Sequence, residues 1–491
     1  MRSSTAALIL AVLTGTSWLI FKVIYNVFFH PLRKYPGPPL WAMSRIPYTT
    51  MYLSGNGPAR MLEIHQKYGE TVCIGPNQLS FLNPDAWKQI MGHRKPSEPE
   101  NTKVPNFFRG GNNTILGADR ESHSQQRRLL SHGFSAQAMM EQQPTTKGYV
   151  DLLIKKLHEN GGGGSKSVDA VAWLNFTTFD LIGDLSVGEP FGSLRNGNYH
   201  PWVALIFGSI QAGAYSFAFS QFPLLSALMR MFVPREIKQK AKDHDGLTRH
   251  LVDKRLAMDN DRLDFLSAIT KSRGSATLSK EQIYGNAGIL IIAGSETTAT
   301  ALSGQLYYLC QTPAVMQKLE QEVRNYFKSE EEIDLLSVQK LSYMGACLEE
   351  GLRLYPPVPM GVPRITTDDT ILFGQHVPRG TTLEIWQWPM YHKPEYFKDA
   401  DKFIPERWLG DSRFATDRLE TVQPFSFGPR NCIGKNLAYA EMRLILSRLI
   451  WNFDITLAEE SKEWVDECFR NVYTLYDKPG LRLYLTPRQV Q

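Results

Sequence analysis

The sequence of 491 residues predicts a mainly α-helical protein with a smaller β portion, preceded by one apolar N-terminal helix. Two long segments, Ile283–Leu309 and Leu335–Leu354, have the length and apolar character of helices, and the second ends at two consecutive prolines. Short stretches typical of strands lie at Glu70–Gly75 and Gln78–Leu82, and again near the C-terminus as TLEIW and LRLYL.

The composition is that of a folded protein with a large core, because 43% of the residues are hydrophobic and 21% are charged. A net charge of +5, without any dense run of lysine and arginine, argues against nucleic acid as a partner. The five cysteines are scattered and odd in number. They fit a reducing compartment and do not form a disulfide framework.

Residues 1–30 are predicted to be a membrane anchor. Ala6–Phe21 is uncharged and mostly apolar, and Val23–Phe29 continues it after one lysine, which together suffice for a span of about 20 residues. A cleaved signal peptide is the alternative, but no clean small-residue cleavage site is present. Basic residues follow the apolar segment, so the positive-inside rule leaves the rest of the chain in the cytosol.

Residues 31–40 contain KYPGPP and are predicted to form a stiff, extended hinge between the anchor and the body, residues 41–491. In the body, Asp119 is a plausible N-cap for a basic helix. The glycines of Asn160–Ser167 predict a flexible surface loop. The apolar stretch Trp202–Val233 fits either core or the lining of an apolar cavity.

The helix over Ile283–Leu309 is interrupted by AGSETT, residues 293–298. Thr297 follows Ala293 by four residues, so its hydroxyl can bond the Ala293 carbonyl and open the helix locally. A groove with a hydroxyl beside the Glu296 carboxylate can hold oxygen and relay protons. The alternative for this stretch alone is a simple helix kink with an exposed glutamate.

The stretch FSFGPRNCIG, residues 425–434, holds a cysteine with no nearby cysteine or histidine that could share a zinc ion. Cys432 precedes a predicted helix, Ile433–Phe453, and a helix N-terminus favours a thiolate. Gly428 and Gly434 permit close approach of a flat ligand, Arg430 can clamp a carboxylate, and Phe425 can pack beside the sulfur. A thiolate, a flat cofactor and its carboxylate together indicate haem held by cysteine.

The spacing F-x-x-G-x-R-x-C-x-G is matched in full, and with it the chain resembles the cytochromes P450, a family of haem-thiolate monooxygenases. AGSETT matches the family's A/G-G-x-D/E-T-T/S motif, and the resemblance makes Glu296 and Thr297 its acid–alcohol pair. It covers essentially the whole chain. It implies one large haem-thiolate domain, residues 41–491, in place of the several domains that length alone would allow.

Further residues are assigned through this resemblance. Glu350 and Arg353 of EEGLR, with Arg407 of FIPERW, become a buried structural triad, although such a pair is usually a solvated surface contact. His123 and Arg127 of HSQQRR, Arg364 of GVPR and Arg430 become partners of the haem propionates. Many family members carry tryptophan where His123 stands. The alternative for HSQQRR is a solvated basic helix face.

The resemblance implies heme b with Cys432 as the iron ligand. It also implies O2 as a substrate and electrons from NADPH-cytochrome P450 reductase, with cytochrome b5 as a second possible donor. The expected location is the endoplasmic reticulum membrane, crossed once, with the catalytic domain cytosolic. The stretches RRLLSHGFS and PERWLGD resemble fungal members that tailor secondary metabolites such as polyketides, terpenoids or alkaloids.

The expected reaction is hydroxylation or epoxidation of an apolar small molecule. The pocket is expected to involve Phe107, Phe108, Ala293, Val358, Val362 and Thr474. One alternative is a haem-thiolate enzyme of the same fold that catalyses desaturation, oxidative coupling or rearrangement. A second is a non-catalytic haem- or lipid-binding membrane protein. The intact Glu296–Thr297 pair argues against this alternative.

Overall fold

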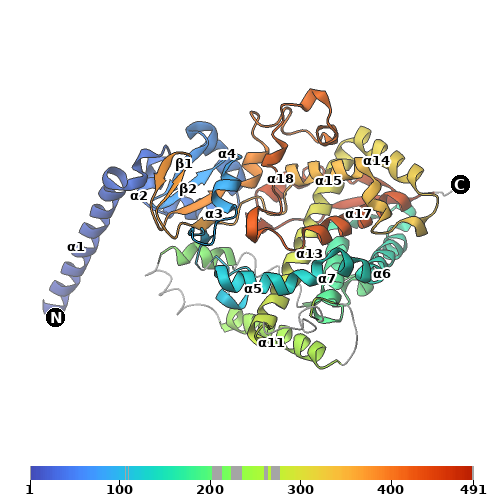
Figure 1. The fold of residues 1–491 in the computed structure, drawn as a ribbon, viewed down its shortest axis with the longest axis horizontal. Coiled ribbons are helices and arrows are strands. Elements are labelled where there is room, and N and C mark those ends of the chain that lie inside the picture. Colours follow the sequence, from blue (N-terminus) through green and yellow to red (C-terminus); the bar gives the residue numbers. More distant parts are fainter. Residues whose placement is uncertain are drawn as a thin grey trace.

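The computed structural model describes residues 2–105, 107–108, 110–201, 213–222, 235–258, 264–266 and 277–488. An N-terminal helix, α1 (Arg2–Ile24), projects from a body whose helices and sheets pack together, and the two termini lie at opposite ends (Figure 1). Of the apolar stretch Trp202–Val233, only residues 213–222 are described, so the rest of that prediction lies outside the described residues.

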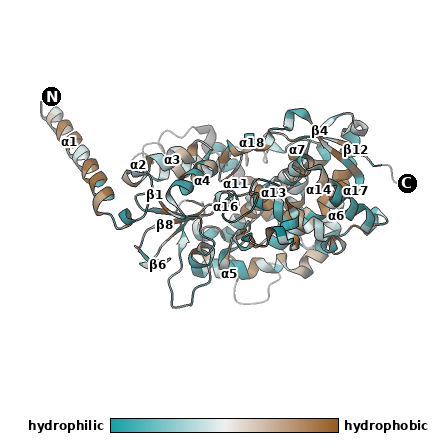
Figure 2. Cartoon of the chain, turned by 90° about the horizontal axis from the view of Figure 1, so that it is seen from above, coloured by the Kyte–Doolittle hydropathy of each residue, from teal (hydrophilic) through white to brown (hydrophobic). Residues whose placement is uncertain are grey.

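The N-terminal helix is apolar along its length, as its colouring in Figure 2 shows. The segment Thr5–Phe29 is long and apolar enough to cross a membrane, and the body covers none of its most apolar part. Its last turn joins the body, because the buried Asn26 side chain donates to the Met43 carbonyl at 3.0 Å. The predicted span is therefore present as one helix, which could anchor the protein in a membrane.

The proline-rich stretch after the anchor is extended and packs against the first strand of the body. The Cys73 amide donates to the Pro36 carbonyl at 2.7 Å. A Cβ at Gly37 would lie 2.3 Å from the Cys73 carbonyl oxygen, so only glycine fits. This contact fixes the direction in which the chain enters the body.

The body is mainly helical, and its longest helix, α13 (Lys280–Gln311), runs through its middle. A capping box at Ser279 and Gln282 begins α13. The helices that surround it or complete the body are α2 (Pro39–Met43), α3 (Ile46–Leu53), α4 (Gly57–Tyr68), α5 (Arg120–Leu130), α6 (Ala136–Asn160), α7 (Ala170–Val187), α8 (Ser193–Asn196), α11 (Arg235–Leu256), α14 (Pro313–Tyr326), α15 (Ser342–Leu354), α16 (Gln387–Tyr391), α17 (Lys435–Asn452) and α18 (Trp464–Phe469).

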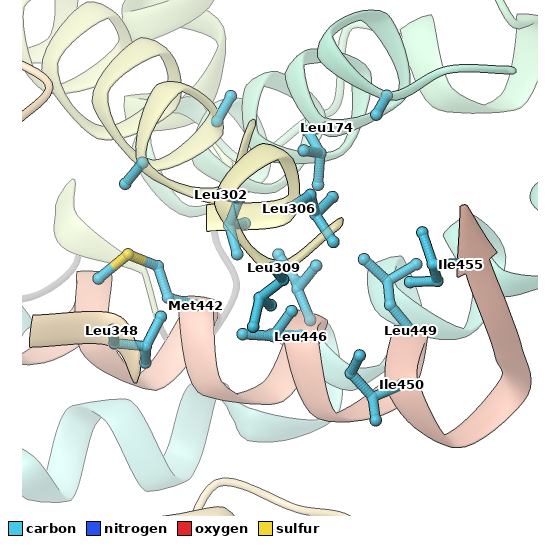
Figure 3. Packing of buried hydrophobic residues seen from close by; sticks show 14 of the residues in the cluster. Leu174, Leu302, Leu306, Leu309, Leu348, Met442, Leu446, Leu449, Ile450 and Ile455 are labelled. Atoms are coloured by element: carbon cyan, nitrogen blue, oxygen red, sulfur yellow. The ribbon is translucent and has the colours of Figure 1, made fainter. Parts of the chain in front are cut away.

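The main core lies where α13 crosses α17 and α7 (Figure 3). Leu302 and Leu309 of α13 face Met442 and Leu446 of α17, and all four are buried. Leu306 of α13, also buried, lies beside Leu174 of α7. Burying each of these side chains contributes about 1.5–3 kcal/mol, so this crossing is a principal source of stability. It also fixes α17, and hence the cysteine in front of it, relative to α13.

Among the described residues, four small sheets complete the body. The largest has the order β1-β2-β8-β5-β3, in which β2 and β8 run parallel. Its strands are β1 (Thr71–Gly75), β2 (Gln78–Phe81), β3 (Thr102–Lys103), β5 (Arg364–Ile365) and β8 (Thr382–Ile385). The others combine β4 (Ser167–Asp169), β12 (Arg482–Pro487) and β9 (Phe453–Leu457); β6 (Thr370–Leu372) and β7 (Gln375–Val377); and β10 (Val472–Tyr473) and β11 (Leu475–Tyr476).

The expected mainly α class and all four strand-like stretches are confirmed, as β1, β2, β8 and β12. One boundary was wrong. The helix expected from Leu335 begins only at Ser342, because a 3-10 turn at Ser337–Lys340 and an extended Leu341 precede it. The expected surface loop Asn160–Ser167 is present as a mostly exposed turn between α6 and β4, where three successive glycines adopt positive φ angles.

Close contact between α13 and the end of α15 makes Gly304 sensitive to substitution. A Cβ there would lie 2.4 Å from Tyr355 Cδ1, whereas a Cβ at Gly345 of α15 would meet nothing within 4 Å. We expect Gly304→Ala to lower the free energy of unfolding by about 1–3 kcal/mol. Gly345→Ala should leave it unchanged or raise it by up to about 1 kcal/mol. Urea unfolding measures both, and equal effects would contradict this packing.

Candidate active site

The cysteine loop, residues 425–434, is a compact turn that leads into α17. The Cys432 amide donates to the Phe425 carbonyl at 2.8 Å, and α17 begins three residues later. Gly428 has φ 76°, and a Cβ there would lie 2.0 Å from the Met91 carbonyl oxygen. Glycine is therefore required at this position by both backbone conformation and packing.

The sulfur of Cys432 faces an interior space. The residue is exposed, yet protein atoms surround it closely enough that burial raises the pKa of its thiol. The Gly434 amide and the charges of Arg127 and Lys435 oppose that rise. A Cβ at Gly434 would lie 4.0 Å from the sulfur and 3.7 Å from Phe134, so this glycine crowds nothing. Phe425 packs on Tyr439, with ring centroids 5.1 Å apart.

One face of α13 is also open to an interior space. Ala293 is exposed although Ile291 and Ser295 on either side of it are buried, and the helix is packed between other helices. The Thr297 hydroxyl donates to the Ala293 carbonyl at 2.6 Å, as the sequence predicts. This exposed carbonyl and its hydroxyl give the open face a local polar group within an apolar helix.

Glu296 directly precedes Thr297 on α13. It is fully buried, and its Oε1 accepts hydrogen bonds from the Lys478 ammonium and from the Thr300 hydroxyl, the latter at 3.2 Å. Its Oε2 is buried without a hydrogen-bond partner. Burial raises the pKa of Glu296, and the positive charge of Lys478 opposes the rise. The sequence places Glu296 beside Thr297 but gives no signal for Lys478.

A cluster of basic side chains lies between the main sheet and α5. His123 and Arg364 are buried, and so is Arg430, whose Nη1 donates to the Ala118 carbonyl at 2.9 Å and whose Nε pairs with Glu100. Lys103, which sequence reasoning missed, pairs across strands with Arg364. We call His123, Lys103, Arg364 and Arg430 the basic cluster.

In the basic cluster, the basic side chains outnumber the carboxylate of Glu100, which pairs with Arg430. Arg364 Nη1 and Arg430 Nη2 are buried and have no hydrogen-bond partner. Burial and the neighbouring cations lower the pKa of His123 to about 3, that of Arg364 to about 10, and that of Lys103 well below its usual range. Buried guanidinium groups without partners are rare unless they bind an anion, and a carboxylate suits them.

Arg127 lies beside this cluster but is occupied by the cysteine loop. Its two terminal nitrogens donate to the carbonyl and the side-chain oxygen of Asn431, at 2.6 and 2.5 Å. The sequence predicts Arg127 as a partner of a cofactor carboxylate. The structure shows it bound to the residue that precedes Cys432.

The predicted triad of Glu350, Arg353 and Arg407 is formed and buried. Glu350 Oε1 accepts from Arg353 Nη2 at 2.8 Å and Arg407 Nε at 3.0 Å, and its Oε2 accepts from Arg353 Nε at 2.9 Å. Two partners were missed because no motif marks them: Trp408, which donates to Oε2 at 2.9 Å, and Asp417, which pairs with Arg407. The two arginines thus share two buried carboxylates, which hold the pKa of Glu350 below its usual value against burial.

Three of the predicted pocket residues are linked through Phe217, which lies in the apolar stretch Trp202–Val233, and through Tyr52, which sequence reasoning missed. Phe107 contacts both Phe108 and Phe217 edge to face, with centroids 4.9 Å apart in each case. Phe217 contacts Tyr52, whose hydroxyl lies 2.7 Å from the Thr474 hydroxyl. We call these five residues the aromatic chain. Of the remaining predicted pocket residues, Val358 and Val362 are half-buried in the segment before β5.

A buried acid, Glu441, joins α17 to α13. The Thr298 hydroxyl hydrogen-bonds to its carboxyl group, whose Oε1 has no partner. Burial raises the pKa of Glu441 to about 8. The residue is therefore neutral at physiological pH. Glu441 is the only acidic residue of α17, and this was the only signal in the sequence.

Known proteins are similar to the chain over nearly its whole length. The family model for Cytochrome P450 matches residues 35–480. Trichothecene C-15 hydroxylase of Fusarium sporotrichioides is 48% identical over 97% of both chains. Cytochrome P450 monooxygenase astJ of Aspergillus oryzae is 40% identical over 96% of both chains. Averantin hydroxylase of Dothistroma septosporum is 41% identical over 96% of this chain and 90% of its own.

The triad yields a stability prediction. Glu350→Gln keeps the shape of the side chain but leaves two buried arginines with less negative charge. We expect the free energy of unfolding to fall by about 3–5 kcal/mol, as for other broken buried ion pairs. Glu459→Gln is the matched control, because Glu459 forms an exposed ion pair with Lys462. This variant should leave the free energy of unfolding unchanged. Urea unfolding of both variants checks this, and an equally small effect for Glu350→Gln would contradict the assignment.

Glu441 yields a pH prediction. Its ordinary pKa is 4.5 and its pKa in the folded protein is about 8. Between these values the unfolded chain loses a proton that the folded protein keeps. The contribution of Glu441 to stability is therefore full below pH 4.5 and is lost as pH rises to about 8, at up to roughly 1.4 kcal/mol per pH unit.

Glu441→Gln cannot titrate, so its stability relative to the parent protein should rise between pH 5 and pH 8, by about 3 kcal/mol in total. Urea unfolding of both proteins at several pH values in that window measures the difference. Other titrating groups cancel in it. A difference that stays constant with pH would show that Glu441 is already ionised in the folded protein.

Proposed function

The chain belongs to the cytochrome P450 family, and from the geometry of its site we propose that Cys432 holds heme b and that the enzyme hydroxylates an apolar secondary metabolite. Membership of the family and hydroxylases among close relatives make it a tailoring monooxygenase of fungal secondary metabolism. The observation that carries the residue-level proposal is the pair of unpartnered guanidinium nitrogens near a cysteine that faces an interior space.

The family implies a haem-thiolate cofactor, and the residues present fit it. Cys432 would ligate the iron, and the basic cluster would bind the two propionates through His123, Lys103, Arg364 and Arg430. Gly428 keeps the loop close to Met91, while Gly434 leaves the side of the sulfur open. When bound, haem supplies activation of O2 for insertion of one oxygen atom into substrate.

The protein's own part in oxygen activation lies on α13. The Thr297 hydroxyl, held against the Ala293 carbonyl, is a polar group on the open face and can donate a hydrogen bond toward that space. Glu296 stands next to it as the proton source, with one oxygen fixed and one without a partner.

The substrate is proposed to enter beside the aromatic chain. Its rings present an apolar, rigid wall, and the paired hydroxyls of Tyr52 and Thr474 give one polar point on it. The relatives are named for hydroxylation of a trichothecene and of averantin. We propose an apolar metabolite of comparable kind, and these two compounds are the first to test as substrates.

Electrons come from a redox partner, as P450 monooxygenases require one together with O2. We propose NADPH-cytochrome P450 reductase as that partner, with cytochrome b5 as an additional donor. The N-terminal apolar helix supports location in the endoplasmic reticulum membrane with the catalytic domain, residues 41–491, in the cytosol.

The ligand assignment is tested with Cys432→Ala. The parent protein, reduced and exposed to carbon monoxide, should give the long-wavelength absorption band of a thiolate-ligated haem, and the variant should lack it. Cys468→Ala is the control, because Cys468 is buried in the core and should leave the band unchanged. A normal band in Cys432→Ala would overturn the assignment.

The reaction is tested with isotopically labelled O2, the purified enzyme and its reductase. A trichothecene or averantin is supplied, and the product is analysed by mass spectrometry. Hydroxylation predicts one labelled oxygen atom per product molecule and consumption of one NADPH. A product that forms with NADPH consumption but carries no label would instead indicate desaturation or oxidative coupling.

A further inference from the structure

The carboxylate of Glu296 is held from a distant part of the chain. Its Oε1 contacts the ammonium of Lys478, which lies 182 residues away in sequence and two residues after β11. Both side chains are nearly inaccessible, with 1% and 3% of their surfaces exposed. Outside the triad and Arg255–Asp264, few ion pairs among the described residues are buried as completely.

The two oxygens of this carboxylate have different surroundings. Oε1 is bound by both Lys478 and Thr300. Oε2 is buried and has no partner, although buried carboxylate oxygens are nearly always bonded. The fixed oxygen sets the orientation of the group, and the free oxygen is the one available to carry a proton.

We propose that Lys478 is a positioning residue for proton delivery, which holds Glu296 by Oε1 and so leaves Oε2 to take up and release the proton. The inference rests on the proposed role of Glu296. In each cycle an O–H bond at Oε2 breaks as the proton moves toward Thr297, and a new one forms with a proton from solvent. No electron moves in this step, and Lys478 stays charged.

The positive charge has a second effect on the acid. Without it, a carboxylate in this buried position would hold its proton more tightly, because nothing would stabilise the ionised form. A weaker acid donates its proton more slowly. Lys478 therefore keeps Glu296 both oriented and able to release its proton. Arginine can supply the same charge at this position, but methionine cannot.

The test compares Lys478→Met, Lys478→Arg, Glu296→Gln and the double variant Glu296→Gln/Lys478→Met. Lys462→Met is the matched control, because Lys462 pairs with Glu459 at the exposed surface. Each holoenzyme is first checked by its reduced carbon monoxide spectrum. NADPH oxidation is then driven by the reductase in H2O and in D2O, and hydrogen peroxide release is measured.

We expect Lys478→Met to slow NADPH oxidation roughly tenfold, to raise the solvent isotope effect and to divert electrons to peroxide, as Glu296→Gln does. Lys478→Arg should restore most of the rate, and Lys462→Met should match the parent. Thermal unfolding should show coupling as well: Lys478→Met should lower the Tm by roughly several degrees in the parent but much less in the Glu296→Gln background.

Two results separate this inference from the proposed function. If Glu296→Gln changes these readouts and Lys478→Met does not, the role of Lys478 is overturned while that of Glu296 stands. If Glu296→Gln leaves them unchanged, the proposed acid is wrong. Should Lys478→Met fail to bind haem, Lys478→Arg decides: parental rate and isotope effect support the role of the charge, and loss like that of Glu296→Gln overturns it.

Discussion

Complete burial of the Glu350 carboxylate constrains the segment that leads to the cysteine loop. Its oxygens accept hydrogen bonds from Arg353, Arg407, Trp408 and the Ile404 amide. Arg353 in turn donates to the carbonyls of Tyr391, Ala400 and Lys402. A buried charge left without partners is strongly unfavourable, so these bonds form together or not at all. Residues 391–417 have little regular secondary structure, and charged hydrogen bonds hold them where a helix or a sheet would otherwise do so.

Electrostatic surroundings differ sharply between the two sides of the site. The basic cluster gathers cations and leaves guanidinium nitrogens without partners, so it is incomplete until anions bind. At Glu296, by contrast, the carboxylate forms an ion pair with Lys478 of the same chain. Burial strengthens the electrostatic interactions in both places, because charges interact strongly where water is excluded. The first suits tight retention of a group with two carboxylates, and the second suits a group that must gain and lose a proton.

The sequence was sufficient for features that are local in the chain. The length and apolarity of α13, the hydrogen bond from Thr297 to Ala293 and the cysteine before α17 all follow from short-range spacing. Residues that contact the site from distant parts of the chain could not be predicted. Lys103, Lys478 and Asp417 lie in short segments without a motif, and each acquires its role only because a distant strand or turn places it against a buried charge. The start of α15 was misplaced for a related reason. The apolar residues of Leu335–Leu341 pack into the core from a turn and extended chain, and not from one face of a helix.

The junction between the apolar helix and the body has a mechanical consequence. Asn26 bonds the Met43 carbonyl, and Gly37 packs against Cys73, so the chain passes from α1 into the first strand without a slack linker. If α1 crosses a bilayer, it acts as a lever whose tilt is passed directly to the body. The height and angle of the body above the membrane surface would then be set by about twenty residues of packed chain. A changed membrane thickness would tilt the whole enzyme rather than bend a tether.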